Sequence, residues 1–116
     1  MSSTTHIGRR AEAAAAMYLD MRGFSIIERN FRRPRCEIDI IASKDGIVYL
    51  VEVKYRKNDD QGGGLEAITA TKLKQMAYAA EMWVAETKWH GPFQLAAIEL
   101  TGPDFTVLGF IDNVYF

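Results

Sequence analysis

The sequence predicts an α/β fold in which helices flank a mixed central β-sheet, with its elements in the order αβββαββ. Two stretches, 7–22 and 69–89, have the apolar spacing of amphipathic helices. Five stretches are apolar and rich in β-formers, and two of them are joined by Asp45-Gly46, a strong signal for a hairpin. The second helix allows the strands on either side of it to pair in parallel, because a parallel connection needs a crossover.

The two helices are predicted from propensity and from their ends. The alanine run in 7–22 has high helix propensity, and Gly23 is a natural stop. Glu12 lies beside the apolar face of this helix, and the pattern alone favours a solvated carboxylate there. The second helix has a core-facing apolar stripe, and Thr69 or Thr71 can serve as its N-cap.

The strands are predicted at 24–33, 36–43, 47–56, 93–100 and 105–111. The polar, glycine-rich segment 57–64 is predicted to be a loop, and the partly apolar tail after 111 to pack on the sheet or on a partner. With 116 residues and no internal repeat, the chain is expected to form one domain over 1–116.

Composition limits the classes of protein to consider. The net charge is −1, so there is no bulk attraction to nucleic acid. The single cysteine, Cys36, excludes an intrachain disulfide, suits a reducing cytoplasm and is expected to be an apolar filler. No apolar run approaches the ~20 residues that span a membrane, and the N-terminus lacks the apolar region of a signal peptide. We therefore expect a cytoplasmic protein without membrane association.

The charge is unevenly distributed along the chain. Residues 1–60 hold 11 Lys/Arg against 9 Asp/Glu, whereas residues 61–116 hold 3 against 6. Clustered basic side chains can contact phosphates, although a solvated charged surface is the alternative. The residues predicted to contact nucleic acid are Arg32, Arg33, Arg35, Arg56, Lys57 and Lys72.

Four charged residues interrupt the apolar pattern of the hairpin: Glu37, Asp39, Glu52 and Lys54. A two-residue turn at 45–46 places Asp39 opposite Glu52 and Glu37 opposite Lys54. Side chains alternate between faces along a strand, and cross-strand partners share a face about 5 Å apart. All four charges are therefore predicted to meet on one face. The opposite face carries residues that can bury: Ile38, Ile40, Val51 and Val53.

The predicted pair of Asp39 and Glu52 is destabilising in a sheet by itself, because like charges repel across strands. Lys54 alone cannot neutralise three carboxylates, whereas a hard divalent cation such as Mg²⁺ accepts carboxylate oxygens and waters. The residue pattern therefore favours a metal site. The alternative is a solvent-exposed patch with a Glu37–Lys54 ion pair.

The spacing from Asp39 to Glu52-x-Lys54 resembles the PD-(D/E)XK nuclease motif, with Ile38 where the motif has proline. Further motifs extend from the first helix into the second: Gly8-x-x-x-Glu12, Gly23-Phe24, Arg29-Asn30, Glu37-Ile38-Asp39-Ile40-Ile41, Val51-Glu52-Val53-Lys54-x-Arg56, Lys72 and Tyr78. Over nearly the whole chain these residues resemble the YraN family, a bacterial family grouped with archaeal-type Holliday junction resolvases.

The resemblance implies a restriction-endonuclease-like fold and hydrolysis of DNA phosphodiester bonds with Mg²⁺ or Mn²⁺, with branched or structured DNA as a candidate substrate. It implies that Asp39, Glu52 and the Val53 carbonyl are metal ligands. It also implies that Lys54 orients or deprotonates the attacking water and that Glu12 completes the acidic cluster. The supporting residues are Glu37, which pairs with Lys54 or contacts the waters of the metal, and Gln75.

Two positions depart from the family pattern, and two other functions stay open. Cys36 stands where the family usually has glycine, and Gln94 stands where an aspartate is expected. A non-catalytic nucleic-acid-binding module of the same fold is the first alternative, and a protein-interaction domain is the second. A homodimer is expected only by analogy, because symmetric cutting of a junction requires two active sites.

Overall fold

The computed structural model describes residues 6–57 and 68–114. Its elements are α1 His6–Met21, β1 Ser25–Arg33, β2 Cys36–Lys44, β3 Ile47–Arg56, α2 Ala70–Thr87, β4 Phe93–Thr101 and β5 Thr106–Ile111. The predicted order is confirmed, and every predicted boundary agrees to within two residues. Apart from Lys57, the predicted loop at 57–64 lies outside the described residues.

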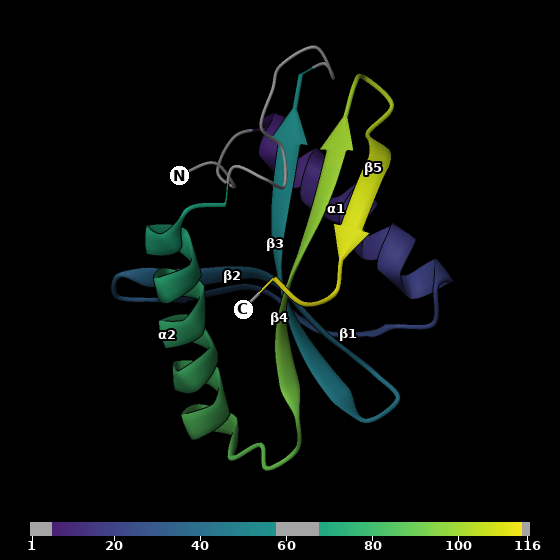
Figure 1. Cartoon of the computed structure of the whole chain (residues 1–116). Helices are drawn as coiled ribbons and strands as arrows, with labels where there is room; N and C mark the ends of the chain where they lie inside the picture. The colour runs from purple at the N-terminus through teal and green to yellow at the C-terminus, as the bar shows by residue number, and fades with distance from the viewer. Residues whose placement is uncertain (1–5, 58–67, 115–116) are drawn as a thin grey trace.

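The five strands form one mixed sheet in the order β1-β2-β3-β4-β5 (Figure 1). Strands β3 and β4 are parallel, and the other neighbouring pairs are antiparallel. The crossover between β3 and β4 contains α2, as the sequence predicted. The fold is the α/β arrangement expected of a restriction-endonuclease-like protein.

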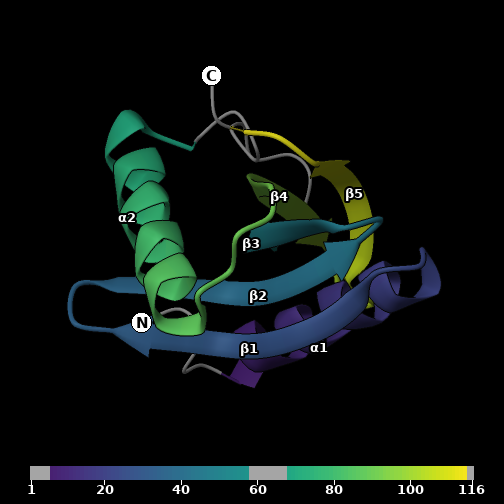
Figure 2. The same cartoon turned by 90° about the horizontal axis from the view of Figure 1, so that it is seen from below.

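The two helices cover opposite faces of the sheet (Figure 2). Each face therefore has its own apolar core, and small alanines let both helices approach the strands closely. The core under α1 includes Ala15, Leu19, Phe24, Ile40, Val51 and Ile98. The core under α2 includes Ile38, Ile41, Leu50, Met76, Ala80, Trp83 and Leu95.

The ends of the helices and the tail follow from local chemistry. The Thr69 side chain accepts a hydrogen bond from the Lys72 N–H, so Thr69 is the N-cap of α2. After α1, Gly23 has φ +93°, a conformation that glycine adopts without steric cost. The predicted packing of the tail is confirmed for Val114, which is buried and whose N–H donates to the Leu95 carbonyl.

Strands β2 and β3 separate partway along their length, and we call this point the fork. Their pairing runs from Lys44 opposite Ile47 to Ile40 opposite Val51, in the register that the turn predicted. Beyond Ile40, β2 stays paired with β1, whereas β3 stays paired with β4. The predicted ladder pairs of Asp39 with Glu52 and of Glu37 with Lys54 are therefore wrong, because the two strands have diverged before these positions.

Strand β2 also turns over at the fork. Ile38 packs in the core under α2, whereas Ile40 packs in the core under α1. The prediction that these two residues share a face is therefore wrong. In β1, the strand that continues beside β2, Asn30 has φ +59°, a left-handed conformation that breaks the regular alternation of side chains. Asp39 lies between Ile38 and Ile40, which pack on opposite faces of the sheet.

Candidate functional site

Asp39 lies at the fork, where its carboxylate accepts a backbone hydrogen bond from β3 that a neighbouring strand would otherwise accept. Its side chain is nearly buried, and its Oδ2 accepts a hydrogen bond from the Val53 N–H at 2.8 Å. The carboxylate thus satisfies a donor that the departing strand β2 no longer pairs. The N–H and C=O of one strand residue point to the same edge, so the Val53 carbonyl is also directed towards the fork.

The surroundings of Asp39 favour its neutral form. Burial and the nearby Glu52 carboxylate raise the pKa of Asp39 to about 7, against a smaller opposing effect of the Val53 N–H. The charges of Glu12 and Glu37 raise the pKa further. The acidic residues predicted to converge therefore lie close enough for their charges to repel one another at Asp39.

Glu52 is paired with a cation from α2. Its Oε1 lies 3.3 Å from the Lys72 Nζ, and the two side chains are only 12% and 27% exposed. Burial raises the pKa of Glu52, while the charges of Lys72 and Lys54 act to lower it. Sequence spacing did not reveal this contact, because Lys72 reaches Glu52 only through the packing of α2 on the sheet.

Lys54 lies two residues beyond Glu52 on β3 and is half-buried. Its charge reaches Glu52, whose pKa it lowers. Within 6–57 and 68–114, its ammonium group forms no hydrogen bond or ion pair. Lys54 is thus near the acidic residues and has a donor available for another group.

Glu37 is paired with Arg32, whose Nη1 lies 3.7 Å from the Glu37 Oε1. The alternative Glu37–Lys54 ion pair is therefore not formed. Glu37 and Glu52 nevertheless line one narrow crevice between β2 and β3. The divergence of the strands keeps Glu37 near the site without placing it beside Lys54.

Glu12 enters from α1 and is 2% exposed, so the expectation of a solvated carboxylate is wrong. Its Oε1 accepts a hydrogen bond from the Asn30 Nδ2 at 2.8 Å and lies 3.4 Å from the Arg29 Nη2. The left-handed backbone at Asn30 lets two consecutive side chains of β1 reach the same carboxylate. Glu12 is thus held at the α1 side of the fork.

The oxygen donors at the fork fit a hard cation. Asp39 is buried, the Glu52 side chain is 12% exposed, and the Val53 carbonyl lies on the same edge of β3 as the N–H that donates to Asp39. Within the described part of the chain, no three His, Cys, Asp or Glu side chains lie close enough together to hold a metal ion. Mg²⁺ fits such a sparse set of ligands, because it keeps several waters and takes one or two carboxylates.

A basic pocket of about 360 Å³ lies next to the fork. Gln75, predicted as a supporting residue, is in this pocket and exposed. The lining residues come from the β1–β2 turn and from α2: Arg32, Arg33, Arg35, Cys36, Glu37, Lys72 and Gln75. Four of the six residues predicted to contact nucleic acid, Arg32, Arg33, Arg35 and Lys72, therefore share one cavity.

Four of the six predicted nucleic-acid contacts form ion pairs within the protein: Arg32 with Glu37, Arg33 with Glu86, Arg56 with Glu99 and Lys72 with Glu52. Arg56 forms an ion pair with Glu99 of β4, and their side chains are 18% and 8% exposed. Arg56 is thus engaged in an ion pair with the neighbouring strand, and its predicted contact with nucleic acid stays a prediction. Arg33 binds Glu86 of α2 through two hydrogen bonds, of 2.7 and 2.5 Å. Lys57, in contrast, is exposed just after β3.

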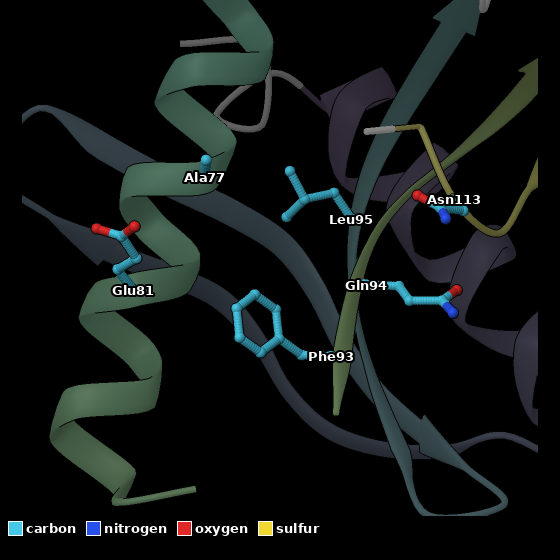
Figure 3. Close-up of a pocket in the computed structure, with 6 residues that line it drawn as sticks. All are labelled: Ala77, Glu81, Phe93, Gln94, Leu95 and Asn113. Carbon is cyan, nitrogen blue, oxygen red and sulfur yellow. The ribbon is translucent and has the colours of Figure 1, made fainter. Parts of the chain in front are cut away.

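Gln94, one of the two departures from the family pattern, lies away from the fork. It lines a separate pocket of about 310 Å³ between α2, β4 and the segment after β5 (Figure 3). Gln94 is paired with Tyr49, whereas Glu52 is paired with Ala97, about 10 Å further along the strand. Its amide therefore does not take the place of a ligand at Asp39. Cys36, the other departure, is buried in the core under α2, which raises its thiol pKa.

Neither helix combines the length and apolar character needed to cross a bilayer within the described residues.

Comparison with known proteins identifies the family. The model of the uncharacterised protein family UPF0102 matches residues 11–101. A UPF0102 protein of Cytophaga hutchinsonii is 33% identical over 86% of this chain and 88% of its own length. One from Clavibacter michiganensis is 35% identical over 89% and 88%, and one from Prosthecochloris aestuarii is 45% identical over 72% and 67%. With the match covering the helix of Glu12, the fork and the helix of Lys72, the chain belongs to UPF0102, the YraN family.

Proposed function

We propose that this protein is a metal-dependent endonuclease that hydrolyses DNA phosphodiester bonds, with Mg²⁺ or Mn²⁺ bound at the fork. The observation that carries the proposal is the burial of Asp39 beside Glu52 where β2 and β3 separate. Burying carboxylates next to each other is costly unless a cation compensates them. A buried carboxylate kept at this cost, where an uncharged acceptor could satisfy the same backbone N–H, is a candidate for function.

Each residue at the fork has a role in this proposal. Asp39 and Glu52 hold the metal, with the Val53 carbonyl as a further ligand. When bound, the metal supplies Lewis-acid polarisation of the phosphate and a water of lowered pKa. Lys54 orients the attacking water and stabilises the charge that develops on the phosphate. Glu12 positions Asn30 and Arg29 on the other side of the fork.

The second candidate function is a non-catalytic nucleic-acid-binding module. The Lys72–Glu52 pair favours it, because that pair neutralises one carboxylate without any metal. In this case DNA binding would depend on salt and not on the metal. The two functions differ in whether Lys72 leaves Glu52 when a divalent cation is added.

We also infer that the protein works in the cytoplasm, where its single cysteine stays reduced.

By analogy with enzymes that cut both strands of a junction, we propose a homodimer as the active form. Sedimentation of the protein with and without branched DNA tests the dimer, and a monomer under both conditions would contradict it.

Cleavage of branched, flapped and linear DNA in Mg²⁺ or Mn²⁺ tests the nuclease proposal. We expect the wild type to cut at least one of these substrates and EDTA to abolish cutting. Asp39→Asn should lower the rate by about 10²-fold or more, because it removes a charge from the metal site. The matched control is Asp45→Asn, the same chemical change at the exposed β2–β3 turn, which should cut normally.

Two results would overturn the nuclease proposal. One is the absence of cutting on all substrates with either metal. The other is cutting by Asp39→Asn at the rate of the wild type.

A further inference from the structure

The β1–β2 turn contains an arginine in a conformation that arginine seldom adopts. Arg33 pairs with Cys36, so Pro34 and Arg35 are the two residues of the turn. Arg35 has φ +66°, where glycine or asparagine is the usual residue of such a turn. The left-handed backbone costs roughly 1–2 kcal/mol for a residue with a Cβ. The fold alone would therefore be served better by glycine at this position.

The turn projects from the body of the protein beside α2, as both views show (Figures 1 and 2). Arg35 is exposed there. Its guanidinium forms no hydrogen bond or ion pair with any residue in the described ranges 6–57 and 68–114. The strain alone does not distinguish Arg35, because exposed Lys88 also has a left-handed backbone, with φ +59°. What distinguishes Arg35 is that it lines the basic pocket.

The basic pocket beneath the turn has the charge of an anion site. Among its cations, Arg32 is paired with Glu37 and Arg33 with Glu86. Arg35 and Lys72 lie at its wall as well, one from the turn and the other from the first turn of α2. The guanidinium of Arg35 presents several N–H donors in a plane, a geometry that matches phosphate oxygens.

Lys72 connects the pocket to the fork. The same side chain lines the pocket and lies 3.3 Å from Glu52. An anion in the pocket therefore lies within the reach of one lysine side chain of the proposed metal site. The shared lysine therefore makes the pocket a candidate site for the phosphate next to the one to be cut on the same DNA strand.

We propose that this pocket binds a backbone phosphate of the DNA substrate, with Arg35 and Lys72 as its cationic contacts. The proposal deepens the proposed function and rests on it, since it names where the strand next to the cleavage site is held. Arg35 positions the strand and takes no part in the chemistry.

Fluorescence anisotropy of labelled branched DNA in EDTA, titrated at several salt concentrations, tests the proposal without cleavage. Arg35→Gly should weaken binding by about 3- to 10-fold and reduce the salt slope by about 0.9, the value for one lost phosphate contact on duplex DNA. Because glycine relaxes the turn, the melting temperature should stay the same or rise. Arg35→Lys should retain the salt slope and recover part of the affinity.

The matched control is Lys88→Gly. Lys88 is an exposed residue with φ +59° at the C-cap of α2, and it does not line the pocket. This change removes the same charge and relieves the same kind of strain, so we expect wild-type binding. If both variants lose affinity equally, only bulk charge is involved and the proposal is overturned.

Three further outcomes decide the proposal. Wild-type affinity and salt slope in Arg35→Gly would overturn it, even if the wild type cuts DNA. Wild type that binds through Arg35 but never cuts would support the pocket and contradict the nuclease. Inorganic phosphate that displaces the DNA at micromolar concentration in the wild type, but not in Arg35→Gly, would show a site for free phosphate and overturn the assignment to the DNA backbone.

Discussion

At the scale of single residues, Asp39 is the residue that best distinguishes a functional site at the fork from a purely structural separation of two strands. Its carboxylate caps the Val53 N–H, yet burial and Glu52 make the charged form unfavourable. An asparagine could accept the same hydrogen bond through its side-chain oxygen without the charge. The fold therefore has no need of the carboxylate, and its presence agrees with the binding of a cation.

This view predicts the effect of Asp39→Asn on stability in EDTA. The pKa of Asp39 is raised from 3.8 to about 7, so the folded protein holds this proton more tightly than the unfolded chain. Its contribution to stability is complete below pH 3.8 and is lost as the pH rises through about 7. Above pH 7, Asp39→Asn should be more stable than the wild type by roughly 1–4 kcal/mol, since one pKa unit is worth about 1.4 kcal/mol.

Thermal unfolding between pH 4 and pH 9 measures this difference. Asp45→Asn makes the same change on an exposed turn and should follow the wild type at every pH. If the difference in stability between Asp39→Asn and the wild type does not grow with pH, this would contradict a raised pKa of Asp39 at the fork.

Some residues of the site could be predicted from the sequence, and others could not. Asp39, Glu52 and Lys54 were predicted by their charge within apolar strands, a local signal. The pairing of Glu52 with Lys72 joins residues of two elements and has no local signal. The internal use of Arg56 depends on Glu99 of the parallel neighbour, which spacing within one strand does not reveal.

At the scale of elements, the hairpin register was predictable and its end was not. The Asp45-Gly46 turn sets which residues pair, and the structure follows that register up to Ile40 and Val51. The separation beyond them arises because β2 keeps β1 as its partner and packs Ile38 under α2, while β3 keeps β4. These strand pairings depend on long-range packing and on the twist of the sheet.

The start of α2 carries a prediction at the same scale. Thr69→Ala removes the acceptor of the Lys72 N–H and should cost about 1 kcal/mol of unfolding free energy. This corresponds to a fall in melting temperature of about 3–5 °C. Thr71→Ala is the matched control, because Thr71 is exposed inside the first turn and caps nothing. An equal loss in both variants would show that the cap contributes no stability of its own.

At the scale of the whole molecule, the forked sheet places two helices at opposite sides of one set of carboxylates. Glu12 comes from α1, Lys72 comes from α2, and Asp39 lies between them at the point where the strands part. The basic pocket lies on the α2 side, between the β1–β2 turn and α2. The proposed metal site and the basic pocket thus lie beside each other, with Lys72 contacting both.

The most direct test of this account is the anomalous density of crystals soaked in Mn²⁺. We expect a peak between Asp39 and Glu52, about 2.1 Å from a carboxylate oxygen of each, with the Lys72 ammonium displaced from Glu52. At saturating Mn²⁺, the absence of a peak at the fork, with the Lys72–Glu52 pair still in place, would contradict the central claim.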